Sequence, residues 1–165
     1  MTVELNRRNF LRGKLKQSDA PRMYPPGAQP NFERLCSQCG ECSSACPEAI
    51  IIRHETGLPV VDFTRGGCTF CNACTDVCET GALLPAPSED WPWQAEIGSS
   101  CFSLNGIACR ACEDACEPRA ISFRLMTGGR SSPILDTDQC TGCGECSATC
   151  PASAITFATI KEKAA

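Results

Sequence analysis

The spacing of its cysteines constrains this chain more than any other feature of the sequence. All sixteen cysteines fall into four groups of four, which together make an internal repeat. Three groups share the spacing C-x2-C-x2-C-x3-C, and they are Cys36, Cys39, Cys42 and Cys46; Cys68, Cys71, Cys74 and Cys78; and Cys140, Cys143, Cys146 and Cys150. The third group along the chain has seven residues between its first two members, and it consists of Cys101, Cys109, Cys112 and Cys116.

This spacing indicates iron–sulfur clusters. Three thiolates two residues apart on a tight loop can reach three irons of a cubane cluster, and the fourth iron needs a thiolate from elsewhere. In bacterial ferredoxins with two clusters, the run C-x2-C-x2-C-x3-C-P gives three ligands to one cluster and its last cysteine to the other. Zinc sites usually take two C-x2-C pairs, and pairwise disulfides give no reason for four similar quartets. We therefore expect four [4Fe–4S] clusters.

The last cysteine of each group is expected to cross to the neighbouring cluster. Cluster 1 is then held by Cys36, Cys39, Cys42 and Cys78, and cluster 2 by Cys68, Cys71, Cys74 and Cys46. In the second half of the chain, cluster 3 is held by Cys101, Cys109, Cys112 and Cys150, and cluster 4 by Cys140, Cys143, Cys146 and Cys116. The irregular spacing of the third group does not by itself assign Cys101 to a cluster.

Apolar runs after each cysteine group predict short strands, at residues 49–52, 82–84, 120–125 and 154–157. Two hairpins are expected, the first from 50–53 with 58–63 and the second from 120–126 with 133–135. The fold class is thus α+β, with two tandem bacterial-ferredoxin-like domains in which hairpins and helical turns surround two clusters each. Halves of this size are marginal folders by apolar burial alone, so metal binding is expected to organise them.

Composition divides the chain into four parts. Residues 1–30 form an irregular basic arm, 31–84 the first ferredoxin-like domain, 85–91 a Pro-rich linker and 92–165 the second domain. Trp91 and Trp93, at the end of the linker, are expected to anchor it by packing.

The residue after the second cysteine of each group supports tight loops around the clusters. It is Gly40, Asn72, Arg110 or Gly144, and a tight loop at this point needs a residue that tolerates positive φ. Glycine and asparagine meet this need, whereas Arg110, in the irregular group, is the exception.

Charge and composition exclude several functions. The arm holds six Lys or Arg against two acidic residues, so the remainder is net −8 within a formal total of −4. Such an acidic body does not favour nucleic acid, and no apolar run is long enough to span a membrane. No nucleophile with a base partner or phosphate-binding loop appears, since Gly66-Gly67 and Gly128-Gly129 are interpreted as turns. We therefore expect a soluble protein that is not an enzyme.

With these motifs in place, nearly the whole chain resembles the NapF family, the ferredoxin-type accessory proteins of bacterial periplasmic nitrate reductase systems. The resemblance rests on the Arg-Arg-Asn-Phe-Leu start at residues 7–11, on Pro25-Pro26, and on residues 61–66 leading into the second cysteine group. It is more specific in residues 95–97, 116–117 and 120–124 and in the wide Cys101 to Cys109 step. It implies that Cys101 belongs to the third cysteine group, although the spacing does not show which cluster it serves.

The resemblance implies a cytoplasmic protein that binds the precursor of the nitrate reductase catalytic subunit and assists its maturation with electrons or cluster components. The alternative is a general polyferredoxin that carries electrons from a cytoplasmic donor to a redox enzyme. Arg7-Arg8 is similar to a twin-arginine signal, but residues 11–17 lack the apolar segment that export requires. A solvated tail and a docking arm are the other interpretations of this segment.

Overall fold

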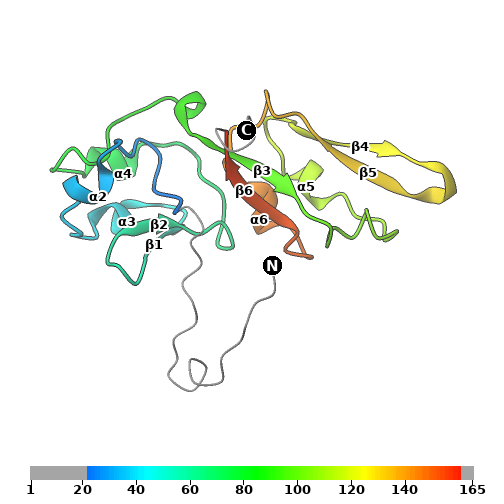
Figure 1. Cartoon of the computed structure of the whole chain (residues 1–165), viewed down its shortest axis with the longest axis horizontal. Helices are drawn as coiled ribbons and strands as arrows, with labels where there is room; N and C mark the ends of the chain where they lie inside the picture. Colours follow the sequence, from blue (N-terminus) through cyan, green and yellow to red (C-terminus); the bar gives the residue numbers. More distant parts are fainter. Residues whose placement is uncertain (1–21, 161–165) are drawn as a thin grey trace, which may run out of the picture.

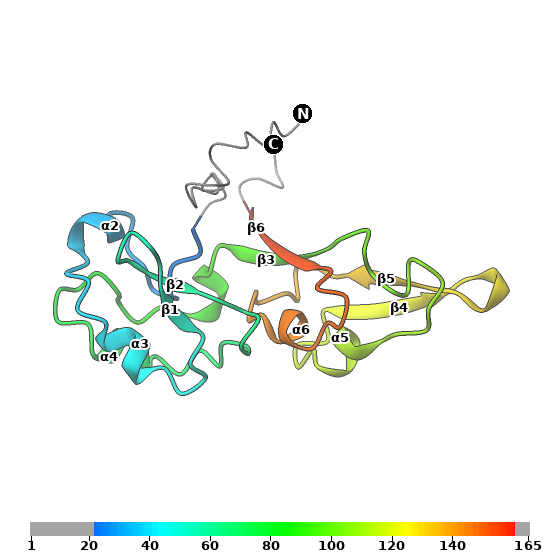
Figure 2. The same ribbon diagram turned by 90° about the horizontal axis from the view of Figure 1, so that it is seen from below.

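The computed structural model describes residues 22–160, so the predicted arm up to Pro21, including Arg7 and Arg8, lies outside the described residues. Two halves lie side by side along the long axis of the molecule (Figures 1 and 2). Each half contains a hairpin and short helices, most of which carry one of its cysteines, in agreement with two tandem domains of mixed helix and strand.

The first half is built around a short hairpin. Its elements are the one-turn helices α2 (Phe32–Leu35), α3 (Glu41–Ala45) and α4 (Ala73–Asp76) and the strands β1 (Ile51–Arg53) and β2 (Pro59–Val61). Ile51 lies opposite Val61 in the antiparallel pair. The turn closes where the N–H of Gly57, at φ 86°, donates to the carbonyl of His54 at 2.8 Å. This first predicted hairpin is confirmed.

The second half carries a longer hairpin, which extends away from the first half (Figure 1). Its elements are the helices α5 (Ala111–Asp114) and α6 (Glu145–Ala148), the 3-10 turn η2 (Thr127–Gly129) and the strands β4 (Ile121–Leu125) and β5 (Ser131–Leu135), while η1 (Ser88–Asp90) lies in the predicted linker. Ile121 lies opposite Leu135. The second predicted hairpin is also confirmed, although β5 begins at Ser131 rather than at Pro133.

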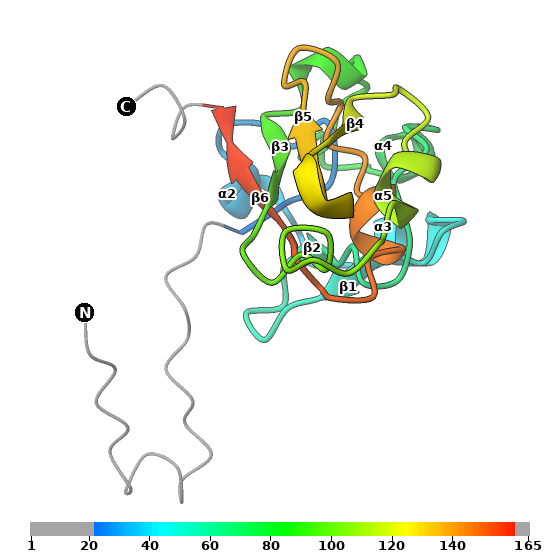
Figure 3. The same ribbon diagram turned by 90° about the vertical axis from the view of Figure 1, so that its right-hand side faces the viewer.

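One strand pair was not predicted in full. The strand β3 (Trp93–Ile97) pairs antiparallel with β6 (Ile155–Thr159), and the two lie side by side when the molecule is viewed end-on (Figure 3). The sequence predicts most of β6 but assigns no strand to residues 93–97. Conversely, the strand predicted at residues 82–84 is wrong, because the structure has only a single bridge between Leu83 and Ala28 there.

The difference between these two pairings follows from proline. Residues 25–30, which face Leu83, include Pro25, Pro26 and Pro30, and a proline has no N–H to extend a ladder. The segment is nevertheless held to the first half, because Gln29 N–H donates to the carbonyl of Ala82 at 3.0 Å. Residues 22–30, predicted as the end of the arm, therefore pack with the first domain in the structure.

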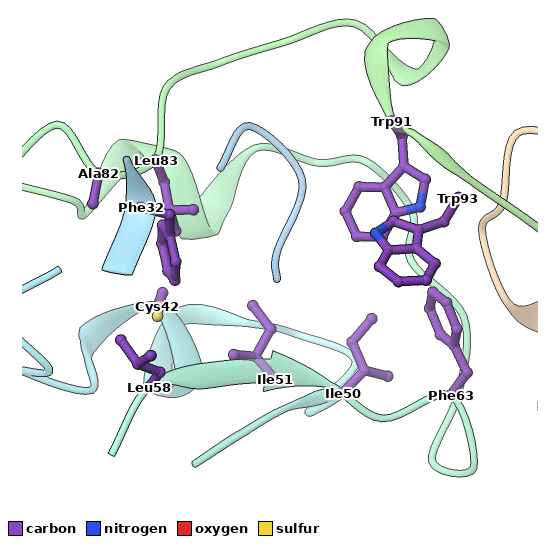
Figure 4. Packing of buried hydrophobic residues seen from close by; sticks show 10 residues of the cluster. All are labelled: Phe32, Cys42, Ile50, Ile51, Leu58, Phe63, Ala82, Leu83, Trp91 and Trp93. Atoms are coloured by element: carbon purple, nitrogen blue, oxygen red, sulfur yellow. The ribbon is translucent and has the colours of Figure 1, made fainter. Parts of the chain in front are cut away.

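The core of the first half continues into the linker (Figure 4). Trp91 and Trp93 are only 5% and 7% exposed and pack in the same cluster as Phe63, which confirms the predicted role of both tryptophans as anchors. A smaller core in the second half includes Ala95, Ile121 and Ile155, together with buried cysteines. Across residues 22–160, the structure contains no helix with the length and apolar character needed to cross a membrane.

Candidate iron–sulfur sites

The cysteine loops repeat one backbone conformation after the second cysteine of each group. There the φ angles of Gly40, Asn72 and Gly144 are 90°, 62° and 89°, as predicted for this position. Each of these residues is the N-cap of a one-turn helix, and that helix carries the third cysteine of its group. Arg110, the predicted exception, has φ −139°. Its side chain instead pairs with Glu113 at 2.5 Å.

A second positive-φ position lies three residues after the last cysteine of every group. It is occupied by Ala49, Gly81, Arg119 and Ser153, with φ between 45° and 66°. Each N–H donates to the carbonyl of the preceding last cysteine at 2.9 to 3.2 Å, which closes a turn. Apart from Gly81, the residue types at this position carry no signal for positive φ, because alanine, arginine and serine rarely adopt this conformation.

The cysteines line four cavities among the described residues, and each cavity draws on two groups. The first contains Cys36, Cys39, Cys42 and Cys78, and it is the widest, at about 620 Å³. The second contains Cys46, Cys68, Cys71 and Cys74. The third contains Cys101, Cys109, Cys112 and Cys150. The fourth contains Cys116, Cys140, Cys143 and Cys146.

The third group has seven residues between its first two cysteines, and Phe102 of this stretch lines the cavity together with Cys101 and Cys109. Ser103 is 2% exposed, and its hydroxyl donates to the carbonyl of Ser131 at 2.6 Å, which ties the insertion to the long hairpin. Asn105 closes the loop through its side-chain amide, which donates to the carbonyl of Cys101 at 2.8 Å. The detour therefore leaves Cys101 beside Cys109 on the cavity wall.

The thiols in these cavities are poor acids when no metal is bound. Burial raises the pKa of Cys42, Cys68 and Cys112 to about 11. Burial, followed by the charges of nearby thiolates, raises the pKa of Cys74 and Cys146 to about 12. Metal ligation requires thiolates, so binding to these residues releases protons and is favoured by higher pH.

The pKa of a buried cysteine is also raised by the charges of cysteines that belong to another group. After burial, the pKa of Cys112 is raised by Cys101, Cys150 and Cys109, which line the same cavity. The pKa of Cys68 is raised by burial first, and the charges that raise it further include that of Cys143 in the other half. Cysteines of separate groups are therefore electrostatic neighbours.

Backbone N–H groups point at several sulfurs. Gln38 donates to Cys36 and Phe70 to Cys68, both at 3.4 Å. After the last cysteines, Leu83 donates to Cys78 at 3.3 Å and Ala154 to Cys150 at 3.4 Å. At Cys78, burial acts to raise the pKa, but hydrogen bonds from Leu83, Thr80 and Ala82 outweigh it and lower the pKa. Donors of this kind stabilise thiolate charge and tune cluster potential.

The donor set fits iron–sulfur clusters. All sixteen cysteines lie within the described residues and are free thiols. In that part of the chain, no three Cys, His, Asp or Glu side chains come close enough to share one metal ion. The thiols instead surround cavities four at a time, with N–H donors directed at sulfur, as thiolate ligation of a multi-iron group requires.

Comparison with known proteins identifies the same units. Residues 35–83 and 107–154 each match a family described as a 4Fe-4S dicluster domain. The second match begins after Cys101, so this cysteine lies outside it. Two 4Fe-4S dicluster domains thus account for most of the cysteines.

Curated relatives extend this similarity to nearly the whole chain. The ferredoxin-type protein NapF of Escherichia coli K12 is 37% identical over 158 residues, covering 94% of this chain and 96% of the relative. The ferredoxin-type protein NapF of Haemophilus influenzae is 38% identical over 174 residues, covering 98% and 99%. The methylamine utilization ferredoxin-type protein MauM of Methylorubrum extorquens is 35% identical over 158 residues, covering 81% and 70%. The chain therefore belongs to the NapF family of ferredoxin-type iron–sulfur proteins.

Proposed function

We propose that the chain holds four [4Fe–4S] clusters in crossed sets and serves as a cytoplasmic accessory protein in the maturation of periplasmic nitrate reductase. The observation that carries the cluster proposal is the lining of four cavities by two cysteine groups each. The accessory role is supported by membership of the NapF family and by the motifs that resemble it.

The residues of this chain have three tasks under the proposal. The cysteine thiolates hold the clusters, with three from one group and the fourth from its neighbour in the same half. The N–H groups of Gln38, Phe70, Leu83 and Ala154 stabilise sulfur charge. The positive-φ turns keep the loops tight. When bound, the clusters supply one-electron redox chemistry, and the protein tunes it through hydrogen bonds, charge and burial.

The partner we propose is the precursor of the nitrate reductase catalytic subunit, which is bound before export and supplied with electrons or cluster components. Deleting the gene and purifying the catalytic subunit tests this role. We expect an inactive subunit that lacks its own cluster, with activity restored by the wild-type gene but not by one carrying Cys39→Ser and Cys71→Ser. A fully loaded, active subunit from the deletion strain would contradict the maturation role.

A second candidate is a polyferredoxin that carries electrons without a part in maturation. It is favoured by the close approach of the two halves, because Cys68 of one half hydrogen-bonds to Cys143 of the other. This role predicts that the deletion strain contains normal catalytic subunit and shows only slower electron delivery to it.

A further inference from the structure

The two halves meet through the loops that carry their cysteines. The N–H of Cys68 donates a hydrogen bond to the carbonyl of Cys143 at 2.6 Å. Beside it, the rings of Phe63 and Phe157 pack with centroids 4.8 Å apart. We call this contact region the joint, and it consists of Phe63, Gly67, Cys68, Cys143, Gly144 and Phe157.

Two glycines allow this close approach. A Cβ added at Gly144 would overlap the ring of Phe63, and one added at Gly67 would lie 3.0 Å from the backbone nitrogen of Glu145. The sequence predicts a turn at Gly66-Gly67, whereas in the structure Gly67 packs against Glu145 of the other half. Glycine at these positions leaves room for the neighbouring half as well as backbone freedom.

The joint borders one cluster cavity in each half. Cys68 lines the second cavity, and Gly144 and Phe157 line the fourth. Within residues 22–160, no residue of the joint lines the first or the third cavity. In Figure 4, Phe63, Trp91 and Trp93 lie at one end of the core, with Phe32 and Cys42 of the first cavity at the other.

We propose that the joint is a positioning device that sets the second and fourth cluster sites side by side, so that the four sites form one row in the order 1, 2, 4, 3. This inference rests on the proposed four clusters and adds which sites are neighbours. Helices α3 and α4 pack together within the first half, and α5 and α6 pack together within the second. With clusters bound, an electron that crossed the joint would oxidise the cluster on one side and reduce the cluster on the other by one electron, with no bond made or broken.

The chain offers a matched pair of variants that isolates the joint. Gly40 and Gly144 occupy equivalent places after the second cysteine, both are the N-cap of a one-turn helix, and their φ angles are 90° and 89°. A Cβ at Gly40 meets nothing within 4 Å, whereas one at Gly144 meets Phe63. Gly40→Ala and Gly144→Ala therefore share the same backbone penalty, and only the second disturbs the joint.

Two measurements on anaerobically purified, cluster-loaded protein test the proposal. In Gly144→Ala, hydrogen exchange at the Cys68 amide should be at least about tenfold faster than in the wild type. After full reduction with dithionite, the electron paramagnetic resonance lines from magnetic interaction between clusters should also change. Gly40→Ala, which strains a loop of the first cavity but leaves the joint intact, should keep the wild-type exchange rate at the Cys68 amide. If hydrogen exchange in Gly144→Ala were unchanged, the proposal that the joint holds the two halves together would be wrong. If exchange were faster but the spectrum unchanged, the joint would be a packing contact only, and the proposal that it positions the clusters would be wrong.

A second variant covers the case in which Gly144→Ala does not load its clusters. Phe63→Ala adds no atoms and should give the same faster exchange and spectral change with full iron content. In the Phe63→Ala background, adding Gly144→Ala should accelerate exchange no further, because the ring it would overlap is gone. Iron content separates the two proposals: well below about sixteen irons in the wild type contradicts four clusters, whereas full iron with no effect of Phe63→Ala contradicts the joint alone.

Discussion

At the scale of single residues, the backbone turns through a positive φ angle after every cysteine group. The residues three positions after the last cysteine have positive φ, yet only Gly81 is a glycine. Arg119, with φ 57°, occupies the equivalent place after Cys116 and is exposed. A non-glycine residue here costs about 1–2 kcal/mol. A glycine removes this cost. It also increases the conformational entropy of the unfolded chain, which destabilises the folded protein by about 0.4–1 kcal/mol.

Arg119→Gly should therefore stabilise the loaded protein by about 0.5–1 kcal/mol, and Gly81→Ala should destabilise it by a similar amount. A Cβ at Gly81 meets nothing within 4 Å, so its replacement changes backbone preference alone. The measurement is the guanidinium concentration at which cluster absorbance is lost, which should rise for the first variant and fall for the second. Shifts in the same direction for both variants would contradict this account of the turns.

At the scale of elements, the sequence predicted what is local. Both hairpins and the positive φ of Gly40, Asn72 and Gly144 follow from apolar runs and from residue types that tolerate these conformations. The strand β3 could not be found this way, because its pairing with β6 joins segments on either side of the cysteine groups. The need for glycine at position 144 to leave room for Phe63 could not be predicted for the same reason, since Phe63 lies in the other half.

The proposed exchange of the last cysteines between the first two groups, which carry α3 and α4, also belongs to this scale. Double variants can test it. Cys39 and Cys71 are both exposed. Each is replaced together with Cys78 in a double variant. Crossed ligation assigns Cys39 and Cys78 to one cluster, so Cys39→Ser with Cys78→Ser should keep about twelve irons. Cys71→Ser with Cys78→Ser removes ligands from two clusters and should keep about eight. Iron analysis of anaerobic protein decides, and the reverse order would mean that each group holds its own cluster.

At the scale of the whole molecule, the apolar core and the metal ligands overlap. Cys42 belongs to the core of the first half, and Cys112 and Cys146 belong to that of the second. Removal of the clusters therefore leaves cavities in the core and cysteine loops that no metal holds in place. Because the folded ligand sets hardly exist in an unfolded chain, the free energy of metal binding contributes directly to folding.

Removing the clusters with ferricyanide and a chelator should therefore unfold the chain rather than leave an empty scaffold. Small-angle scattering should show the radius of gyration rising toward about 40 Å, the value expected for an unfolded chain of this length, with loss of the near-ultraviolet circular dichroism of the buried tryptophans. Iron and sulfide with reductant should restore both signals, whereas reductant alone should restore neither. A compact chain with intact tryptophan dichroism after complete iron loss would show that apolar burial alone keeps the chain folded, and the predicted dependence of folding on the clusters would be wrong.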